Sequence, residues 1–224
     1  MIPGFPLYAD LLFILTALLT AVFLYSASER STAAAIAVLI ILAAETLLSL
    51  CGFYRSGGSF PPRFIFLALP AVIFMISLFF FNGGRQFIDS LDEEILTYLH
   101  IVRIPVEISL YILFIYKMVP EIMTFGGRNF DILSGITAPI IAYFGYRKKM
   151  IGKKVILIWN FISLGLLFNV VITAVLSVPS GIQQFGFDQP NTGVLYFPFV
   201  WLPGFIVPTV LFSHIVCIKK LLIK

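Results

Sequence analysis

Residues 7–27 read LYADLLFILTALLTAVFLYSA, and this run decides the fold class of the chain. A helix needs about 20 consecutive, mostly apolar residues to cross the hydrocarbon core of a bilayer, and residues 7–27 meet that length. No lysine or arginine precedes the run, whereas a cleaved signal peptide begins with a positively charged segment. We therefore predict that residues 7–27 form a retained membrane-spanning helix.

Six further apolar runs follow, separated by short polar connections. They are Ala33–Tyr54, Arg63–Phe81, Leu96–Val119, Phe130–Tyr146, Val155–Val178 and Val194–Ile218. No connection between them is long enough to form a soluble domain. The sequence therefore predicts an all-α fold, a polytopic membrane helix bundle of about seven transmembrane helices that forms a single domain over residues 1–224.

The amino-acid composition leads to the same prediction. Hydrophobic residues make up 60% of the chain and charged residues only 12%, whereas soluble domains have about 25% charged residues. The net charge is +4, but the basic residues gather at the ends of the apolar runs, where anionic lipid headgroups attract them. We therefore expect the lipid bilayer as a partner and no nucleic acid.

The distribution of basic residues between the two sides predicts an orientation, because cytoplasmic connections carry an excess of lysine and arginine. With seven spans, one side holds Arg30, Arg85, Arg147, Lys148, Lys149, Lys153, Lys154, Lys219, Lys220 and Lys224. The other side holds only Arg55, Arg63 and Arg128. We therefore expect the N-terminus outside and the C-terminus in the cytoplasm.

The fourth run, residues 96–119, carries an unusual share of ionisable residues. At about 100° per residue its charged residues fall on one face, which we expect to point into the bundle because ionisable groups in lipid are costly. The four-residue spacing predicts ion pairs of Arg103 with Glu107 and of Lys117 with Glu121. The stripe could only hold neighbouring helices in register, or it could line a polar cavity. Its members are His100, Arg103, Glu107, Tyr111, Phe114, Lys117 and Glu121.

Glu45 in the second run is a candidate for the same site. It lies close to the middle of its span, as does Glu107. If the two helices are neighbours, these carboxyl groups could share a proton or compete for Arg103. No basic residue lies within one turn of Glu45, so it needs either a partner from another helix or a proton.

Asparagine and histidine residues complete the candidate set. Asn160 and Asn169 point to opposite faces of the sixth run, so at most one of them lines the cavity. His100 and His214 lie near the cytoplasmic ends of their helices, and two histidines at this spacing do not require a metal ion. We expect no metal and no cofactor, and a ligand- or ion-binding site made from Glu45, His100, Arg103, Glu107, Tyr111, Lys117, Asn160 and His214.

Three kinds of function fit this pattern. The first is a small-molecule or ion transporter, with proton coupling through the buried carboxyl groups, or a ligand-binding membrane protein. The second is an intramembrane enzyme that modifies a lipid with a carboxylate–histidine pair. The third is a structural or accessory subunit whose charged stripe pairs with another chain. We favour the first, with a small-molecule or ion substrate, and the sequence is compatible with a homo-oligomer but does not determine the oligomeric state.

Two seven-helix families are excluded by missing residues. A retinal Schiff base needs a lysine inside the last span, and the last run contains none before Lys219. Zinc hydrolases of the membrane need about three histidine ligands, and this chain has two histidines.

Three segments carry a resemblance to a family. They are residues 123–131 (MTFGGRNFD), 132–139 (ILSGITAP) and 197–203 (FPFVWLP). These segments resemble uncharacterised bacterial membrane proteins with several spans. The resemblance covers the C-terminal half of the chain, implies a location in the bacterial inner membrane, and implies no activity.

Overall fold

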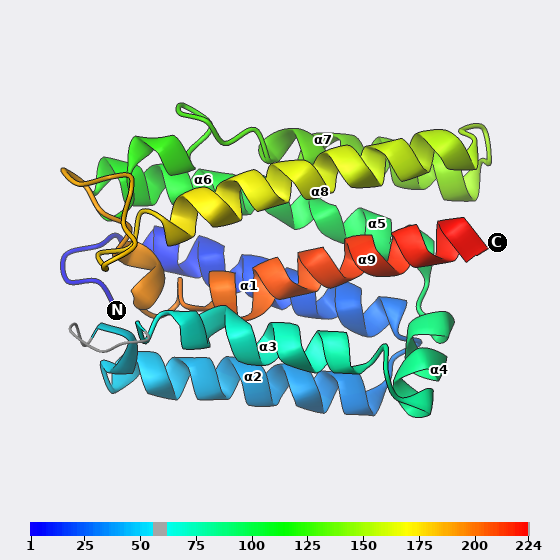
Figure 1. Ribbon diagram of the computed structural model, residues 1–224, viewed down its shortest axis with the longest axis horizontal. Coiled ribbons are helices and arrows are strands. Elements are labelled where there is room, and N and C mark those ends of the chain that lie inside the picture. Colours follow the sequence, from blue (N-terminus) through cyan, green and yellow to red (C-terminus); the bar gives the residue numbers. More distant parts are fainter. Residues whose placement is uncertain (56–61, 224) are drawn as a thin grey trace.

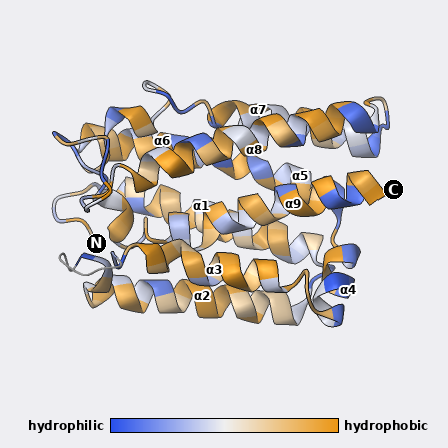
Figure 2. Cartoon of the chain, in the orientation of Figure 1, coloured by the Kyte–Doolittle hydropathy of each residue, from blue (hydrophilic) through white to orange (hydrophobic). Residues whose placement is uncertain are grey.

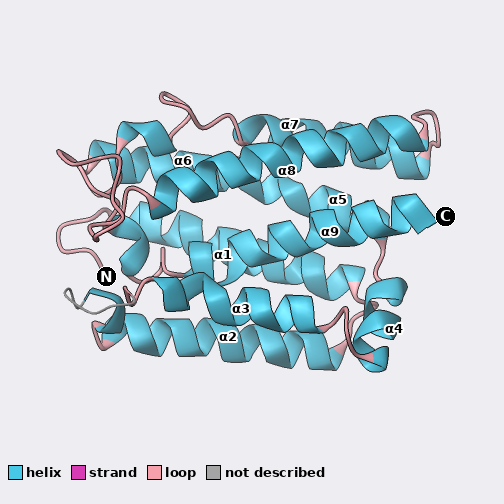
Figure 3. Cartoon of the chain, in the orientation of Figure 1, coloured by secondary structure: helices cyan, strands magenta, loops and turns pink. Residues whose placement is uncertain are grey.

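The computed structural model describes residues 1–55 and 62–223, and all regular structure within them is helical (Figure 3). The helices are α1 (Leu7–Ala27), α2 (Thr32–Leu50), α3 (Ile65–Ser77), α4 (Asn82–Ser90), α5 (Glu93–Leu99), α6 (Arg103–Ile115), α7 (Ile132–Ile141), α8 (Lys153–Val175) and α9 (Val207–Ile223). Short 3₁₀ turns are η1 (Phe53–Arg55), η2 (His100–Val102), η3 (Glu121–Met123) and η5 (Gly193–Leu195). Single π-helical turns are η4 (Ala142–Arg147) and η6 (Leu202–Ile206). The predicted all-α class is confirmed.

Five helical stretches in residues 1–55 and 62–223 are long and apolar enough to cross a membrane. They are Leu7–Ala27, Thr32–Leu50, Glu93–Ile115, Lys153–Val175 and Leu202–Ile223. Helices α3 and α4 make a sixth candidate only if they are counted as one span, and a bend of 93° separates them. The predicted run Phe130–Tyr146 corresponds to α7 and η4, which are too short to meet the same criterion.

The long helices run along the longest axis of the molecule (Figure 1). Helices α2 and α3 lie along one edge, α6, α7 and α8 lie along the opposite edge, and α1 and α9 lie between them. The two termini lie at opposite ends of the bundle. The α1–α2 connection, α4 and the η4–α8 connection all lie at the C-terminal end, so that the two predicted clusters of basic residues share one end. Lys224 lies outside the described residues.

Hydrophilic residues concentrate at the ends of the bundle, whereas the middle of most helices is hydrophobic (Figure 2). Helix α4 turns across the C-terminal end and is held there by the end of α9. Lys219 Nζ donates to Asp89 Oδ1 at 2.8 Å, and Lys220 Nζ donates to the Asp89 carbonyl at 2.9 Å. Residues 82–90, which we expected as a connecting loop, therefore form a short helix across the end of the bundle.

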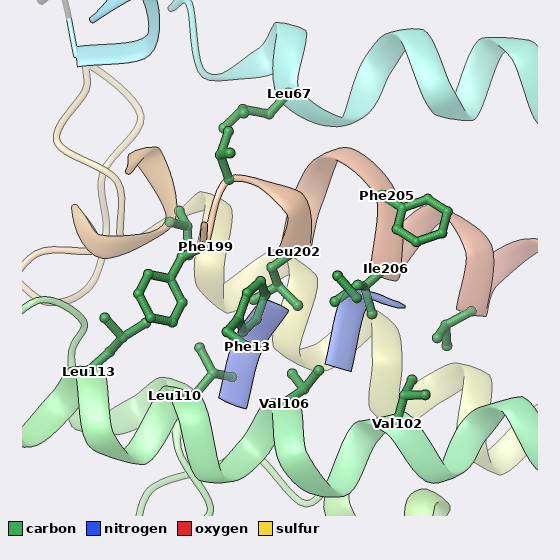
Figure 4. Packing of buried hydrophobic residues seen from close by; sticks show 14 of the residues in the cluster. Phe13, Leu67, Val102, Val106, Leu110, Leu113, Phe199, Leu202, Phe205 and Ile206 are labelled. Carbon is green, nitrogen blue, oxygen red and sulfur yellow. The ribbon is translucent and has the colours of Figure 1, made fainter. Parts of the chain in front are cut away.

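The main core lies between α1, α6 and the segment that leads into α9. Figure 4 shows Phe13 of α1 close to Val106 and Leu110 of α6, with Leu202 and Ile206 of η6 beside them. Large apolar side chains also remain on the outer surface of the helices, for example Leu39 at 66% and Ile162 at 61% exposure. Exposed large apolar side chains along the helices are expected where helices face lipid.

The charged run ends earlier than the sequence predicts. Helix α6 ends at Ile115, and Lys117 adopts a left-handed conformation with φ 58°. The Lys117 N–H donates to the Phe114 carbonyl and the Met118 N–H donates to the Leu113 carbonyl, both at 2.9 Å. This hydrogen-bond pattern is a Schellman motif, which closes a helix. Lys117 therefore lies beyond the helix that was expected to carry it.

Candidate functional site

The predicted span at residues 130–146 forms one short helix, α7 continued by η4, and the segment before this helix brings polar groups into the bundle. Helix α7 begins at Ile132, part-way along the bundle (Figure 1), while η3 packs beside α6 and α8. Asp131 occupies the N-cap position of α7 and is 4% exposed. The N-terminus of a helix favours a negatively charged neighbour, so the start of α7 is a suitable place for a buried carboxylate.

Arg103 at the start of α6 is the centre of the polar network. Its Nη1 donates to Asp131 Oδ1 at 3.0 Å and to the Ser163 carbonyl of α8 at 3.2 Å. Its Nη2 lies 2.8 Å from Nε2 of His214 in α9. Because a guanidinium group has no acceptor, His214 Nε2 must accept this hydrogen bond. Arg103 therefore joins α6, α7, α8 and α9 at one point.

The network continues from His214 into α8. Since His214 Nε2 accepts from Arg103, the proton of the neutral ring is on Nδ1, which donates to Asn160 Oδ1 at 2.8 Å. Asn160 Nδ2 then donates to the Ile156 carbonyl at 3.0 Å. Each member thus orients the next one, and the chain of hydrogen bonds determines one tautomer of His214.

The two histidines of the chain stack on each other inside the bundle. The ring centroids of His100 and His214 are 3.9 Å apart with an angle of 21° between the planes, and both residues are fully buried. Trp159 packs edge-on against His100 at 5.5 Å and donates its Nε1 proton to Thr137 Oγ1 at 2.9 Å. The histidines are therefore core groups of the bundle.

Glu107 lies one turn further along α6 and has a different partner from the one predicted. Asn129 Nδ2 donates to Glu107 Oε1 and also to the Met123 carbonyl, the latter at 2.9 Å. Asn129 Oδ1 accepts from the Asp131 N–H at 3.0 Å. The segment before α7 thus folds back so that one asparagine side chain binds the Glu107 carboxyl group and the backbone of Met123 and Asp131.

The expected ion pairs along the fourth run are replaced by other contacts. The buried ion pair of the described residues joins Arg103 to Asp131, not to Glu107. The start of α7 brings the Asp131 carboxylate to Arg103, and Glu107 accepts a hydrogen bond from Asn129. Lys117 and Glu121 form no ion pair in the described part of the chain. Both are exposed and lie beyond the end of α6, so that the four-residue spacing of a helix does not bring them together.

The outer half of the predicted stripe also departs from the site. Tyr111 is 37% exposed and stacks on Phe125 with the ring centroids 4.8 Å apart. Of the eight candidate residues, His100, Arg103, Asn160 and His214 come together, and Glu107 lies beside them. Tyr111, Lys117 and Glu45 lie elsewhere.

A cavity of about 330 Å³ lies beside Glu107, between α3 and α8. Most of its wall is apolar, and Glu107, Asp131 and Asn191 are its polar members. Two of these polar residues each carry a buried oxygen atom, Glu107 Oε2 and Asn191 Oδ1, that has no hydrogen-bond partner among the described residues. The cavity therefore combines apolar walls with two residues that each have an unpaired acceptor atom. Its apolar members include Leu67, Val72, Leu110, Leu167, Val171 and Val175.

Glu45 lies in a separate groove between α2 and α3. Tyr54 OH donates to Glu45 Oε2 at 2.7 Å. The groove lies on one face of α3, along Phe66 and Pro70, whereas the cavity beside Glu107 lies along Leu67 and Val72. The expected meeting of the two carboxyl groups is therefore absent from the described structure.

Three members of this site, Asn129, Asp131 and Trp159, were not among the residues predicted from the sequence. Asp131 occupies the N-cap position of α7 but makes no side-chain cap and instead pairs with Arg103. The sequence holds one indication of Asp131. A buried arginine such as Arg103 needs a carboxylate partner, and Asp131 is an acidic residue at the start of a neighbouring apolar run.

The site offers no grouping of metal ligands. Among the described residues, no three of the histidine, cysteine, aspartate and glutamate side chains lie so that they could hold a metal ion. Its chemistry is that of a buried ion pair, neutral imidazoles and carboxyl groups beside an apolar cavity.

The chain was compared with known proteins. Neither the curated proteins nor the solved structures gave a match. A family model described as "Domain of unknown function (DUF8737)" matches residues 60–222, which include α3 to α9 and all members of the polar network. The chain therefore belongs to the DUF8737 family of unknown function.

Proposed function

We propose that the protein is a multi-pass integral membrane protein that binds an amphiphilic small molecule in the cavity between α3 and α8. The observation that supports the proposal is an apolar cavity lined by Glu107 and Asn191. Each of these residues has an oxygen atom without a hydrogen-bond partner among the described residues. Ligand pockets of proteins typically measure about 300–1,000 Å³ and are mainly apolar, with a few placed polar groups. The cavity, at about 330 Å³, fits this description.

The polar groups indicate the kind of ligand. Glu107 Oε2 and Asn191 Oδ1 are both oxygens that accept hydrogen bonds, and leaving such atoms unpaired in a buried site is costly. A ligand whose polar end donates hydrogen bonds, such as a long-chain alcohol or amine, would satisfy them. Its hydrocarbon part would lie against Leu67, Leu167 and Val171.

The membrane topology is part of the proposal. The positions of the termini at opposite ends of the bundle (Figure 1) support an odd number of crossings. We propose seven, of which α3 makes one and α7 with η4 makes another. The basic connections at the C-terminal end support a cytoplasmic C-terminus and an outside N-terminus. In a bacterial cell this would place the chain in the inner membrane.

Ligand binding is favoured here over proton-coupled transport or lipid chemistry. A single proton path would require Glu45 and Glu107 to share a cavity, and they line hollows on different faces of α3. An enzyme with a carboxylate–histidine pair would need an imidazole nitrogen that contacts the carboxylate. Both ring nitrogens of His214 are engaged by Arg103 and Asn160, and the ring nitrogens of His100 have no hydrogen-bond partner, carboxylate or other, among the described residues.

Photolabelling tests the proposal. The purified protein in lipid nanodiscs would be illuminated with a long-chain alcohol that carries a diazirine, and the labelled residues would be identified by mass spectrometry. We expect the label on the cavity faces of α3 and α8. Val171→Trp fills the cavity and should reduce this labelling about tenfold, which corresponds to a loss of about 1.4 kcal/mol in binding.

The matched control is Ile162→Trp, which adds the same side chain to the exposed face of the same helix. This variant should be labelled like the unmodified protein. Equal labelling over the whole outer surface of the helices, or equal labelling of the two tryptophan variants, would contradict the proposed site.

A further inference from the structure

The groove between α2 and α3 is a second hollow with its own chemistry. Its volume is about 560 Å³. Ala37 and Ala44 of α2 leave space on one side, and Phe66, Pro70 and Phe74 of α3 form the other side. None of these residues lines the cavity beside Glu107, so the two hollows are separate.

Glu45 is the acidic residue of the groove. It is 6% exposed, and Tyr54 OH donates to its Oε2 at 2.7 Å. A Cβ atom at Gly204 would lie only 2.9 Å from Cγ and Cδ of Glu45, so the glycine provides the room in which the carboxyl group sits. The ion pairs among the described residues use other carboxylates. Glu45 therefore faces the groove without a basic partner from the described part of the chain.

Aromatic rings line the same groove as this carboxyl group. Phe53, Tyr54, Phe66 and Phe74 all line the groove, and the Phe53 ring packs against Tyr54 at 5.3 Å and Phe66 at 6.4 Å. The faces of aromatic rings attract cations, and aromatic cages recognise quaternary ammonium groups. The chain already uses one of these rings in this way, because the Arg63 guanidinium carbon lies 5.0 Å from the Phe53 ring centroid.

We propose that this groove binds a hydrophobic organic cation, whose positive charge lies beside Glu45 and whose apolar groups contact the aromatic rings. A buried carboxylate is costly without a positive partner, and a cation that partitions into lipid can supply one from the bilayer. Tyr54 supports the carboxylate with one hydrogen bond, and the remaining interaction is left to the ligand. The proposal rests on residues different from those of the cavity beside Glu107.

Equilibrium dialysis of tetraphenylphosphonium against the protein in lipid nanodiscs tests the proposal, with empty nanodiscs as the background. Tetraphenylborate, an anion of the same shape, measures the contribution of charge. We expect saturable binding of one tetraphenylphosphonium per chain and no saturable binding of tetraphenylborate. Glu45→Gln keeps the shape of the side chain and should weaken cation binding about tenfold or more, because charge-assisted contacts are the strong ones.

Three further variants separate the effect of charge from an effect on folding. Glu29→Gln makes the same change at an exposed turn and should bind like the unmodified protein. Ala44→Phe fills the groove but keeps the carboxylate, whereas Ala43→Phe adds the same ring to the neighbouring exposed position outside the groove. We expect binding to be lost only in Ala44→Phe.

Equal binding of the two ions, or unchanged affinity in Glu45→Gln or Ala44→Phe, would overturn the inference. Labelling of the other cavity by the long-chain alcohol should be unaffected by Ala44→Phe. Failure at this groove can thus be distinguished from failure of the proposed function.

Discussion

Replacing Arg103 with methionine is expected to lower the free energy of unfolding by about 3–5 kcal/mol, the cost of removing one partner from a buried ion pair. Arg103 and Asp131 are only 2% and 4% exposed, so water cannot take the place of the guanidinium group. The substitution also removes the donors to the Ser163 carbonyl and to His214 Nε2. Chemical denaturation in detergent micelles, followed by circular dichroism, would measure the loss.

The matched control for this prediction is Lys219→Met. It breaks the ion pair with Asp89, in which the carboxylate is 64% exposed, and exposed pairs contribute little to stability. The double variant Arg103→Met with Asp131→Leu should recover part of the lost stability, since no unpaired charge remains. If Arg103→Met unfolds at the same denaturant concentration as Lys219→Met, the network is not a structural centre of the bundle.

Gly135→Leu is expected to destabilise the fold by about 1–3 kcal/mol or more, the usual cost of overfilling a packed contact. A Cβ atom at Gly135 would lie 2.9 Å from Ile104 Cγ1, 3.1 Å from the Ile104 backbone nitrogen and 3.3 Å from Arg103 Cβ. A larger side chain must therefore push α7 away from α6. Because Asp131 precedes α7, the same movement would lengthen its contact with Arg103.

Gly165→Leu provides the comparison, because a Cβ atom at Gly165 of α8 would meet nothing within 4 Å. A leucine there should be neutral or stabilising, since glycine costs about 1 kcal/mol in a helix relative to good helix formers. Thermal unfolding of both variants in the same detergent would rank them. Equal unfolding temperatures would show that α7 does not pack closely on α6.

The apolar runs predicted most of the helices, because length and composition alone determine what can cross a bilayer. Residues 7–27 form a helix with the predicted bounds, and the sixth run differs from α8 by only a few residues. Two deviations have local causes. The third run turns after Ser77, where α4 leaves at 93°, and α6 is closed early by the left-handed conformation of Lys117.

The inward direction of the first half of the charged stripe was also predictable. His100, Arg103 and Glu107 are all buried, as the cost of charges in lipid requires. Their partners were not predictable from spacing along one helix. The i, i+4 rule describes pairs on one isolated helix. Here α7 starts inside the bundle, so that Asp131 binds Arg103 and Asn129 binds Glu107 in place of an Arg103–Glu107 pair.

The separation of Glu45 from Glu107 has the same kind of explanation. Similar depth in two spans says nothing about which helices are neighbours. The structure places α3 so that one face lines the groove with Glu45 and another lines the cavity with Glu107. Only the arrangement of the helices in space divides one predicted site into two hollows.

Ligand binding in the cavity between α3 and α8 can be seen directly in an electron cryomicroscopy map of the protein in lipid nanodiscs with an excess of a long-chain alcohol. We expect elongated density between α3 and α8 that ends within hydrogen-bond distance of Glu107 and Asn191. A cavity that is closed by side chains, or that contains only separate water peaks while the alcohol binds elsewhere, would contradict it.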